Sequence, residues 1–353
     1  VRNRDTYRKL FYQLQLNYQT KIADDHNIAA MGLFSRDKDA LGSEIPHFRE
    51  DWVFRTTYNY ADKYFIEYNG AYNGSEKFGP ENRFDFFSSG GVSWIISKEN
   101  FMKKTESFLD LLKFRGSYGQ VGDDGGYQRN LSQRFIYQSQ WGYGGKSYLG
   151  TTGESAEQSP YTWYNELSVA NPQIHWEVAK KINLGADFGF FKGLVSGTFD
   201  WFSENRTDVL LPGNQRAIPP YFGATAPIAN LGQVKNKGYE VELKFNYTFG
   251  NGLNLWWTTN VTHSKNKIIT ADDPELFPAY QKKEGYSVNQ AHSYVSQGYY
   301  NTWDELYAST IHSTNDAVKL PGNYNILDYN GDGVIDADDN IPYGYTGTPQ
   351  NTY

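Results

Sequence analysis

The segment YEVELKFNYTF, residues 239–249, alternates apolar and polar side chains without interruption. Its six apolar or aromatic residues occupy the odd positions, with Glu, Lys, Asn and Thr between them. On a helix these six side chains would scatter around the axis, whereas on a strand they share one face. The segment therefore predicts a β-strand with one apolar and one polar face, and LFYQLQLNYQ near the start of the chain repeats the pattern.

The same period recurs along much of the chain and predicts about ten strands. Segment 26–35 fits the period less well, and is predicted as a strand because it follows a short polar turn. Each strand is expected to run for about 9–11 residues, the length that crosses a bilayer when tilted. The remaining candidate strands are 10–20, 52–60, 64–73, 84–96, 112–120, 180–190, 194–202, 239–249 and 253–265.

Short and long connections alternate between these strands. Tight turns are expected within 23–27, 60–64, 190–195 and 249–253, while 97–111 is of intermediate length. An up-and-down meander places all short turns at one end of the sheet and all long loops at the other, as in outer-membrane barrels. The long connections are 121–173, 203–237 and everything after 266.

Two architectures share this alternation. A soluble β-sandwich also turns one face of each sheet toward a core, so a secreted, calcium-stabilised β-sandwich binding module remains the alternative. Polar faces rich in Gln, Asn, Thr and Glu, the strand length, and aromatic residues near the strand ends favour the barrel. The predicted fold class is all-β, as a segment of a large antiparallel transmembrane β-barrel with short periplasmic turns and long extracellular loops.

Composition excludes several functions. The chain has 353 residues, a formal net charge of -7 and no Cys, which excludes disulfides, thiolate metal sites and Cys nucleophiles. No basic stripe stands out, so no nucleic-acid partner is expected. No run of about 18 apolar residues occurs, so no transmembrane helix is predicted. No HExxH, P-loop or G-x-S-x-G motif occurs either, and the chain is predicted not to be an enzyme.

The stretch DYNGDGVIDADD, residues 328–339, has the spacing of an EF-hand calcium loop. Gly333 falls where that loop needs a positive φ, but the flanking segments are too rich in Pro, Gly and Asn for the helices of an EF-hand. We expect a structural Ca²⁺ site, and the alternative is an Asx-rich turn that caps its own backbone without metal. The candidate oxygen ligands are Asp328, Asn330, Asp332, Val334 through its carbonyl, Asp336 and Asp339.

Two aromatic groups, QWGYGG at 140–145 and YTWY at 161–164, lie in the long connection 121–173. Aromatic rings of this kind stack on sugars, contact a partner protein, or pack within their own loop. The sequence leaves these three roles open.

Six stretches, in chain order, carry a family resemblance: SWIISKENF (93–101), LLKFRGSYGQVGDD (111–124), NPQIHWEVAKKINLGADFGFF (171–191), NLGQVKNKGYEVEL (230–243), EGYSVNQAHSYVSQGYYNTWDEL (284–306) and PGNYNILDYNGDGVIDADDNIPYG (321–344). Together they resemble the SusC/RagA family, the TonB-dependent outer-membrane transporters of Bacteroidetes.

The resemblance implies that residues 1–353 are an interior part of a barrel domain that closes at about 22 strands. Residues 266–353 would be a long extracellular loop region that carries the 328–339 loop. The implied location is the outer membrane, as a multi-pass β-barrel surrounded by outer-membrane lipid. A complete family member would also have a signal peptide, a plug and a TonB-contacting segment.

The implied function is uptake of oligosaccharides or peptides, driven through TonB, with a SusD-like surface lipoprotein over the extracellular face. Transport of this kind needs no catalytic residue in this part of the chain.

Overall fold

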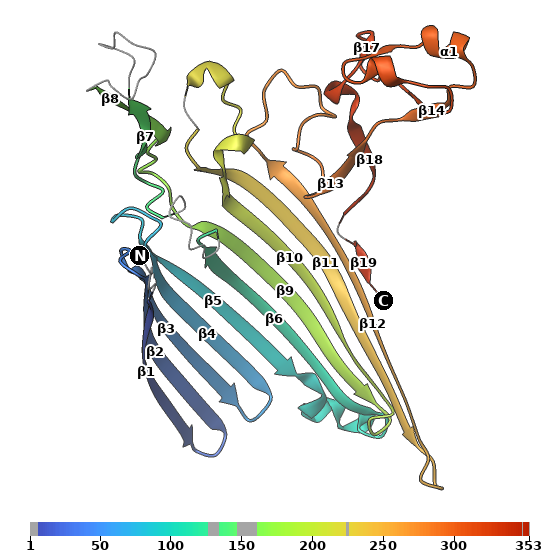
Figure 1. Cartoon of the computed structure of the whole chain (residues 1–353). Coiled ribbons are helices and arrows are strands. Elements are labelled where there is room, and N and C mark those ends of the chain that lie inside the picture. Colours follow the sequence, from blue (N-terminus) through green and yellow to red (C-terminus); the bar gives the residue numbers. More distant parts are fainter. Residues whose placement is uncertain (1–5, 126–133, 147–160, 224–225, 348, 353) are drawn as a thin grey trace.

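The computed structural model describes residues 6–125, 134–146, 161–223, 226–347 and 349–352. Within these ranges eleven strands form one antiparallel sheet, and Figure 1 shows its long strands as a single tilted and curved layer. The strands, in their order across the sheet, are β1 (Tyr7–Ile22), β2 (His26–Leu41), β3 (His47–Tyr60), β4 (Tyr64–Ser75), β5 (Phe84–Ile95), β6 (Leu109–Asp123), β9 (Glu177–Phe190), β10 (Val195–Leu211), β11 (Ala229–Thr248), β12 (Asn254–Thr270) and β19 (Asn351–Thr352).

All ten predicted strands are present, including β2 with its weak period. Their predicted length of 9–11 residues was wrong, because the ten strands run from 12 residues in β4 and β5 to 20 in β11. The apolar alternation covers only part of most strands, and in β9 to β12 it covers the part nearer the short turns. The backbone pairing continues beyond it, as in 229–238 of β11, where most side chains are polar or small and the period is lost.

Tight turns gather at one end of the sheet, at the bottom of Figure 1. The β1–β2 and β3–β4 hairpins turn through Ala23-Asp24 and Ala61-Asp62, with φ angles between 49° and 59°. Two successive residues with positive φ reverse the chain within three unpaired residues, between the pairs Ile22–His26 and Tyr60–Tyr64. We call this the short-turn end. At the opposite, long-loop end lie the connections 42–46, 76–83, 124–176 and 212–228 and the chain after β12.

Side chains alternate between the two faces of the sheet along each strand, and the strand register aligns the apolar residues on one face and the polar residues on the other. Tyr239 and Tyr247 on the apolar face of β11 are 41% and 44% exposed, so no second sheet covers them in the described chain. An uncovered apolar face is expected for the wall of a membrane barrel and not for a sandwich. One cross-strand row on this face holds Phe114, Ala186, Phe199, Val241 and Val261, and the adjacent row on the polar face holds Arg115, Gly185, Asp200, Glu240 and Thr262.

Short helices and strands lie at the two ends of the large sheet. At the short-turn end, two 3₁₀ helices, η1 (Ile96–Lys98) and η2 (Asn100–Thr105), connect β5 to β6. After β12, which extends to Thr270, the chain makes an excursion and returns to pair β19 with β12. The other elements, all outside the large sheet, are β7 (Gln140–Lys146), β8 (Thr162–Ser168), η5 (Gly213–Gln215), η6 (Pro220–Phe222), β13 (Gln290–Ser293), β14 (Ser296–Tyr299), α1 (Trp303–Tyr307), β15 (Ile311–His312), η7 (Asp316–Val318), β16 (Tyr324–Ile326), β17 (Val334–Ile335), η8 (Ala337–Asp339) and β18 (Ile341–Thr346).

A small core lies at the long-loop end. Phe78, Phe87, Ile174 and Trp176 are each at most 4% exposed and pack together, with Trp176 against both phenyl rings. Asn171 donates from its side-chain amide to the Ile228 carbonyl at 2.7 Å, which joins two of the long loops. The stretch NPQIHWE at 171–177 therefore organises the loops. No helix in the described ranges is long and apolar enough to span a bilayer.

Candidate functional site: the polar face and the loop cluster

A groove of about 670 Å³ runs along the polar side of the sheet between β3 and β9. Side chains of both charge signs meet there, separated by small residues such as Ser117 and Gly119. A surface of this kind suits water and polar solutes better than a packed core. Its charged and amide residues are Arg55, Glu67, Asn69, Lys113, Arg115, Lys181 and Asn183.

Ion pairs tie neighbouring strands together across this face. Arg115 of β6 donates to Asp187 of β9 at 3.1 Å, and to both carboxylate oxygens of Asp200 of β10 at 2.8 and 2.6 Å. Gly185 lies between them because a Cβ there would come within 2.7 Å of the Arg115 guanidinium carbon and 2.8 Å of an Asp200 oxygen. The polar face is thus internally paired and pre-formed.

The short-turn end carries an aromatic row. Tyr60, Tyr64 and Trp94 stack in sequence on the apolar face with ring centroids 6.2 Å apart at each step. Glu99 accepts hydrogen bonds from the Tyr64 hydroxyl at 2.6 Å, the Trp94 indole at 3.2 Å and the Lys63 ammonium at 3.4 Å. These hydrogen bonds, of which the one from the Tyr64 hydroxyl has the largest effect, hold the pKa of Glu99 below its usual range. The stretch SWIISKENF therefore supplies Trp94, and the Glu99 carboxylate that accepts from it, to an aromatic row of the kind found at membrane interfaces.

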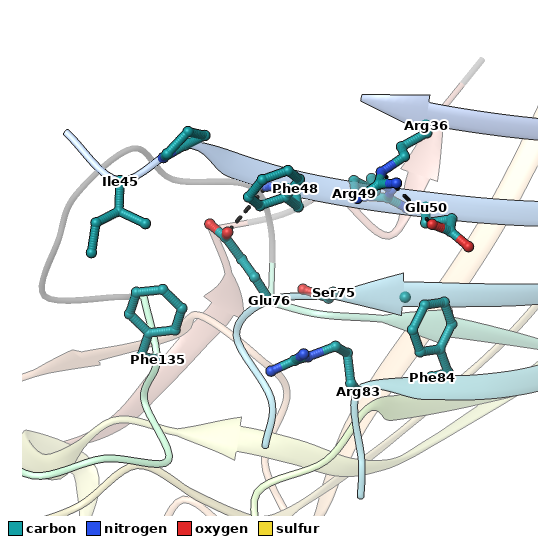
Figure 2. Close-up of a pocket in the computed structure, with 12 residues that line it drawn as sticks. Arg36, Ile45, Phe48, Arg49, Glu50, Ser75, Glu76, Arg83, Phe84 and Phe135 are labelled. Atoms are coloured by element: carbon teal, nitrogen blue, oxygen red, sulfur yellow. Dashed lines mark hydrogen bonds and ion pairs between the residues drawn. The ribbon is translucent and has the colours of Figure 1, made fainter. Parts of the chain in front are cut away.

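At the long-loop end, Glu76 and Arg134 join three loops, as Figure 2 shows in part. Glu76 accepts from the Phe48 backbone N–H at 3.1 Å, from Arg134 at 3.1 Å, and contacts Nδ1 of His47 at 2.6 Å. Arg134 also donates to the carbonyls of Ile45 and Pro46 at 2.6 and 2.9 Å. His47 and Arg134 are each 2% exposed, so this buried network fixes the relative position of the loops.

A cavity of about 380 Å³ lies beside this network. Figure 2 shows Arg36, Phe48, Arg83, Phe84 and Phe135 around it. Sequence reasoning missed both the network and the cavity, because their residues come from separate loops and form no local motif.

The two predicted aromatic groups form a hairpin of β7 and β8 at the long-loop end. Trp141, Tyr143 and Tyr164 are each 62% exposed, and the rings of Tyr143 and Tyr164 meet edge to face at 5.9 Å. These rings do not pack into a core of the described chain. Their exposure leaves them available to a ligand or a partner.

The structure brings the predicted calcium residues into one tight loop. Asp328 accepts from the backbone N–H groups of Gly331 and Gly333 at 2.7 and 2.8 Å, and both glycines have positive φ, 74° and 86°. Asp339 is fully buried and accepts from the backbone of Tyr329 at 2.6 Å and of Asp336 at 2.9 Å. The flanking elements are the short strands β16 and β18, as the prediction of non-helical flanks required.

These hydrogen bonds are those of an Asx-rich turn. In the described chain, no three acidic or His side chains gather closely enough to form a metal centre. Asn330 and Asp332 bond to each other, and Asp332 accepts from the Val334 N–H at 2.8 Å. The donor set, carboxylates with one amide and one carbonyl oxygen, has the chemistry that a hard cation prefers.

Relatives can be found for most of the chain, although no protein-family model matches it. TonB-dependent receptor P3 of Formosa agariphila is 28% identical over 261 residues, 70% of this chain and 24% of the relative. TonB-dependent receptor SusC of Bacteroides thetaiotaomicron is 26% identical over 305 residues, 82% of this chain and 27% of the relative. The RagAB peptide importer in its open-open state matches with a TM-score of 0.71 and 16% identity, over 98% of this chain and 38% of that one. This chain is SusC/RagA-like.

The family resemblance predicted from six sequence stretches is thereby confirmed, and so is the all-β fold class. The sheet has the fold of part of the RagAB β-barrel, and the described strands form an open arc. The chain spans about a quarter of the length of the two curated relatives just named. These relatives are named as receptors, which agrees with the prediction that the chain is not an enzyme.

Proposed function

We propose that this SusC/RagA-like chain forms part of the wall of an importer that takes up oligosaccharides or peptides across the outer membrane. Energy would come through TonB, and a SusD-like lipoprotein would cover the long-loop end. The observation that supports this proposal is the sheet itself, with an uncovered apolar face on one side and an ion-paired polar face on the other. The exposed aromatic hairpin of β7 and β8 supports contact with cargo or lipoprotein at the long-loop end.

Cysteine scanning tests the two faces, because this chain has no Cys and any Cys elsewhere in the full-length protein can first be replaced by Ser. In the full-length protein that carries this chain, Glu240→Cys and Glu242→Cys should react with a water-soluble maleimide, whereas Val241→Cys should be shielded by lipid. A lipid-dissolved quencher should give the opposite order at the same three sites. Equal labelling at all three positions would contradict a sheet with one shielded face. Shielding of Val241→Cys in a protein that is monodisperse without detergent, and that a lipid-dissolved quencher does not reach, would instead support the soluble sandwich.

Transport is tested in cells that lack the protein and in complemented cells. We expect complementation to restore uptake of either a defined oligosaccharide mixture or a defined peptide mixture, and collapse of the proton gradient to stop it. Mass spectrometry of cargo that co-purifies with the protein decides between the two classes. Pull-down of the intact protein should recover a SusD-like lipoprotein, and uptake that continues without a proton gradient would contradict dependence on TonB.

We also propose that the 328–339 loop holds Ca²⁺ as a structural ion outside the membrane, through Asp328, Asn330, Asp332, Val334, Asp336 and Asp339. None of these four Asp has an ion pair with a basic side chain among the described residues, so a cation would neutralise them. Hydrogen exchange of 321–344 should be faster in EGTA than in Ca²⁺, and Asp332→Ala should abolish the difference. Equal protection with and without Ca²⁺ would leave the metal-free turn as the correct description.

A further inference from the structure

A cluster of five lysines lies on the apolar face of the sheet, near its long-loop end. Strand register sets Lys180, Asn205, Lys235 and Lys267 side by side in one row across β9 to β12. The next row of the same face holds Ile182, Ser203, Lys237 and Lys265. All five lysines are exposed. We call Lys180, Lys235, Lys237, Lys265 and Lys267 the lysine cluster.

These lysines differ from the basic residues on the opposite face of the same strands. On the polar face, Lys181 pairs with Glu204 at 3.3 Å, Arg206 pairs with Asp123 at 3.0 Å, and Lys244 pairs with Glu242. No member of the lysine cluster has an ion pair in the described structure. Where the pairing of β9 to β12 is regular, no Asp or Glu lies on the apolar face. The cluster therefore carries five uncompensated positive charges.

Two pairs in the cluster are directly opposed. Lys235 lies opposite Lys267, and Lys237 lies opposite Lys265, on adjacent antiparallel strands. Opposite residues of such a pair have Cβ atoms about 5 Å apart, and like charges at these positions destabilise the sheet. An anion bound across β11 and β12 would remove this repulsion.

The position of the cluster identifies the kind of anion. The next row toward the short-turn end holds Leu184, Trp201, Tyr239 and His263, and the row after it is wholly apolar. Two residues along a strand cover about 7 Å, less along the membrane normal when the strand is tilted. The charges thus lie at the edge of the apolar band, where long Lys side chains reach the headgroup level. A ligand that fits both the positive charges and the apolar rows beside them has phosphate groups at the level of the lysines and hydrocarbon chains on the side of the short-turn end.

We propose that the lysine cluster binds the phosphate groups of a membrane lipid in the leaflet at the long-loop end, with the acyl chains of that lipid over the apolar rows of β9 to β12. Phosphate is a multivalent acceptor that several ammonium groups can share. The bound lipid would offset the repulsion between β11 and β12 and so stabilise this part of the sheet.

The test uses the full-length protein in detergent, with lipid A bearing two phosphates, one phosphate or none as the probe. Binding is followed by native mass spectrometry, and the thermal unfolding midpoint is measured with and without lipid. The test variant is Lys235→Gln with Lys267→Gln. The matched control is Lys103→Gln with Lys104→Gln, which removes two exposed lysines from η2 at the short-turn end.

We expect affinity to fall as phosphates are removed from the lipid, and to fall about fivefold for each lysine replaced, since a lysine near an anionic surface contributes about that factor. The control variant should bind like the wild type. Without lipid, the test variant should unfold no earlier than the wild type, because it has lost a repulsive pair; this separates lost binding from misfolding. Wild-type affinity in the test variant, or equal binding of the phosphate-free lipid, would overturn the proposal. Displacement of the lipid by equimolar pyrophosphate would also overturn it, in favour of a site for free anions.

Discussion

Replacement of Arg115 by Gln should weaken the sheet where β6, β9 and β10 meet. The guanidinium makes one hydrogen bond to Asp187 and two to Asp200, and its side chain is 32% exposed. A hydrogen bond to a charged group contributes about 1.5–3 kcal/mol when it is shielded from water. The three bonds share one guanidinium and are partly solvated, so the total is well below their sum. We expect Arg115→Gln to lower the free energy of unfolding by about 2–3 kcal/mol.

The loss of stability in Arg115→Gln should have a second, more specific effect, which a double mutant can measure. Without Arg115, Asp187 and Asp200 remain as diagonal neighbours on adjacent strands, and among the described residues the only cation left beside them is Lys113, 3.9 Å from Asp187. The two carboxylates then repel each other. Asp200→Asn in the Arg115→Gln background should therefore recover part of the lost stability, although Asp200→Asn alone should be destabilising. A double-mutant cycle on Arg115 and Asp200 should give a coupling free energy of about 1–2 kcal/mol.

The assay is urea unfolding of the full-length protein in lipid or detergent, followed by tryptophan fluorescence. Lys181→Gln is the matched control, because Lys181 lies on the same face and has one ion pair at 3.3 Å but a side chain that is 50% exposed. An exposed pair of this kind contributes less than about 1 kcal/mol. Equal losses for Arg115→Gln and Lys181→Gln, or a coupling free energy near zero, would refute the view that shielded ion pairs stabilise the polar face.

Three further predictions concern other parts of the chain. Gly238→Ala should lower the free energy of unfolding by about 1–3 kcal/mol in the same urea assay, because its Cβ would lie 2.1 Å from the His263 carbonyl oxygen. Trp176→Ala should cost about 3–5 kcal/mol and speed proteolysis of the long loops, since Trp176 is 2% exposed in their core. Burial and Lys319 lower the pKa of His312, so the unfolded segment takes up a proton before the folded one does as the pH falls below about 6.5. The protection factors of the amides in 309–319, which correct the exchange rate for its intrinsic dependence on pH, should therefore fall on acidification, and His312→Gln should remove that dependence.

The strands and their two faces could be predicted because side-chain alternation is a local property. In 239–249 each odd residue is apolar, and the structure puts those of 239–247 on one face, in unbroken register with β12 as far as Thr248 and with β10 as far as Phe245. The strand ends could not be predicted in the same way. β10 and β11 pair through an irregular register near Val209 and Gly232, and that irregularity shifts the side-chain period where the strand leaves the apolar band.

The network of Glu76, His47 and Arg134 at the long-loop end could not be predicted from the sequence, for a different physical reason. Glu76 and Arg134 lie in two connections and His47 begins β3, and only the pairing of β2 to β6 brings these residues together. The EF-hand-like spacing of 328–339 was visible in the sequence because all its candidate ligands lie within twelve residues. Such a spacing brings the side-chain oxygens together but does not decide what they bind. In the structure, the carboxylate oxygens of Asp328, Asp332 and Asp339 accept hydrogen bonds from backbone N–H groups of the loop.

The lysine cluster shows why charge must be counted by face and not along the chain. A formal net charge of -7 and scattered basic residues predicted no basic surface. The segments VKNKG and SKNKI are each an ordinary polar strand end when read alone. Antiparallel pairing of β11 with β12 sets their lysines opposite one another, while the acids of the same strands, such as Glu240 and Glu242, lie on the other face. In a membrane barrel the two faces meet different solvents, so acids in the lumen do not neutralise lysines at the lipid surface. The uncompensated charge is then a property of the outer face alone, and an anion at that face is what would balance it.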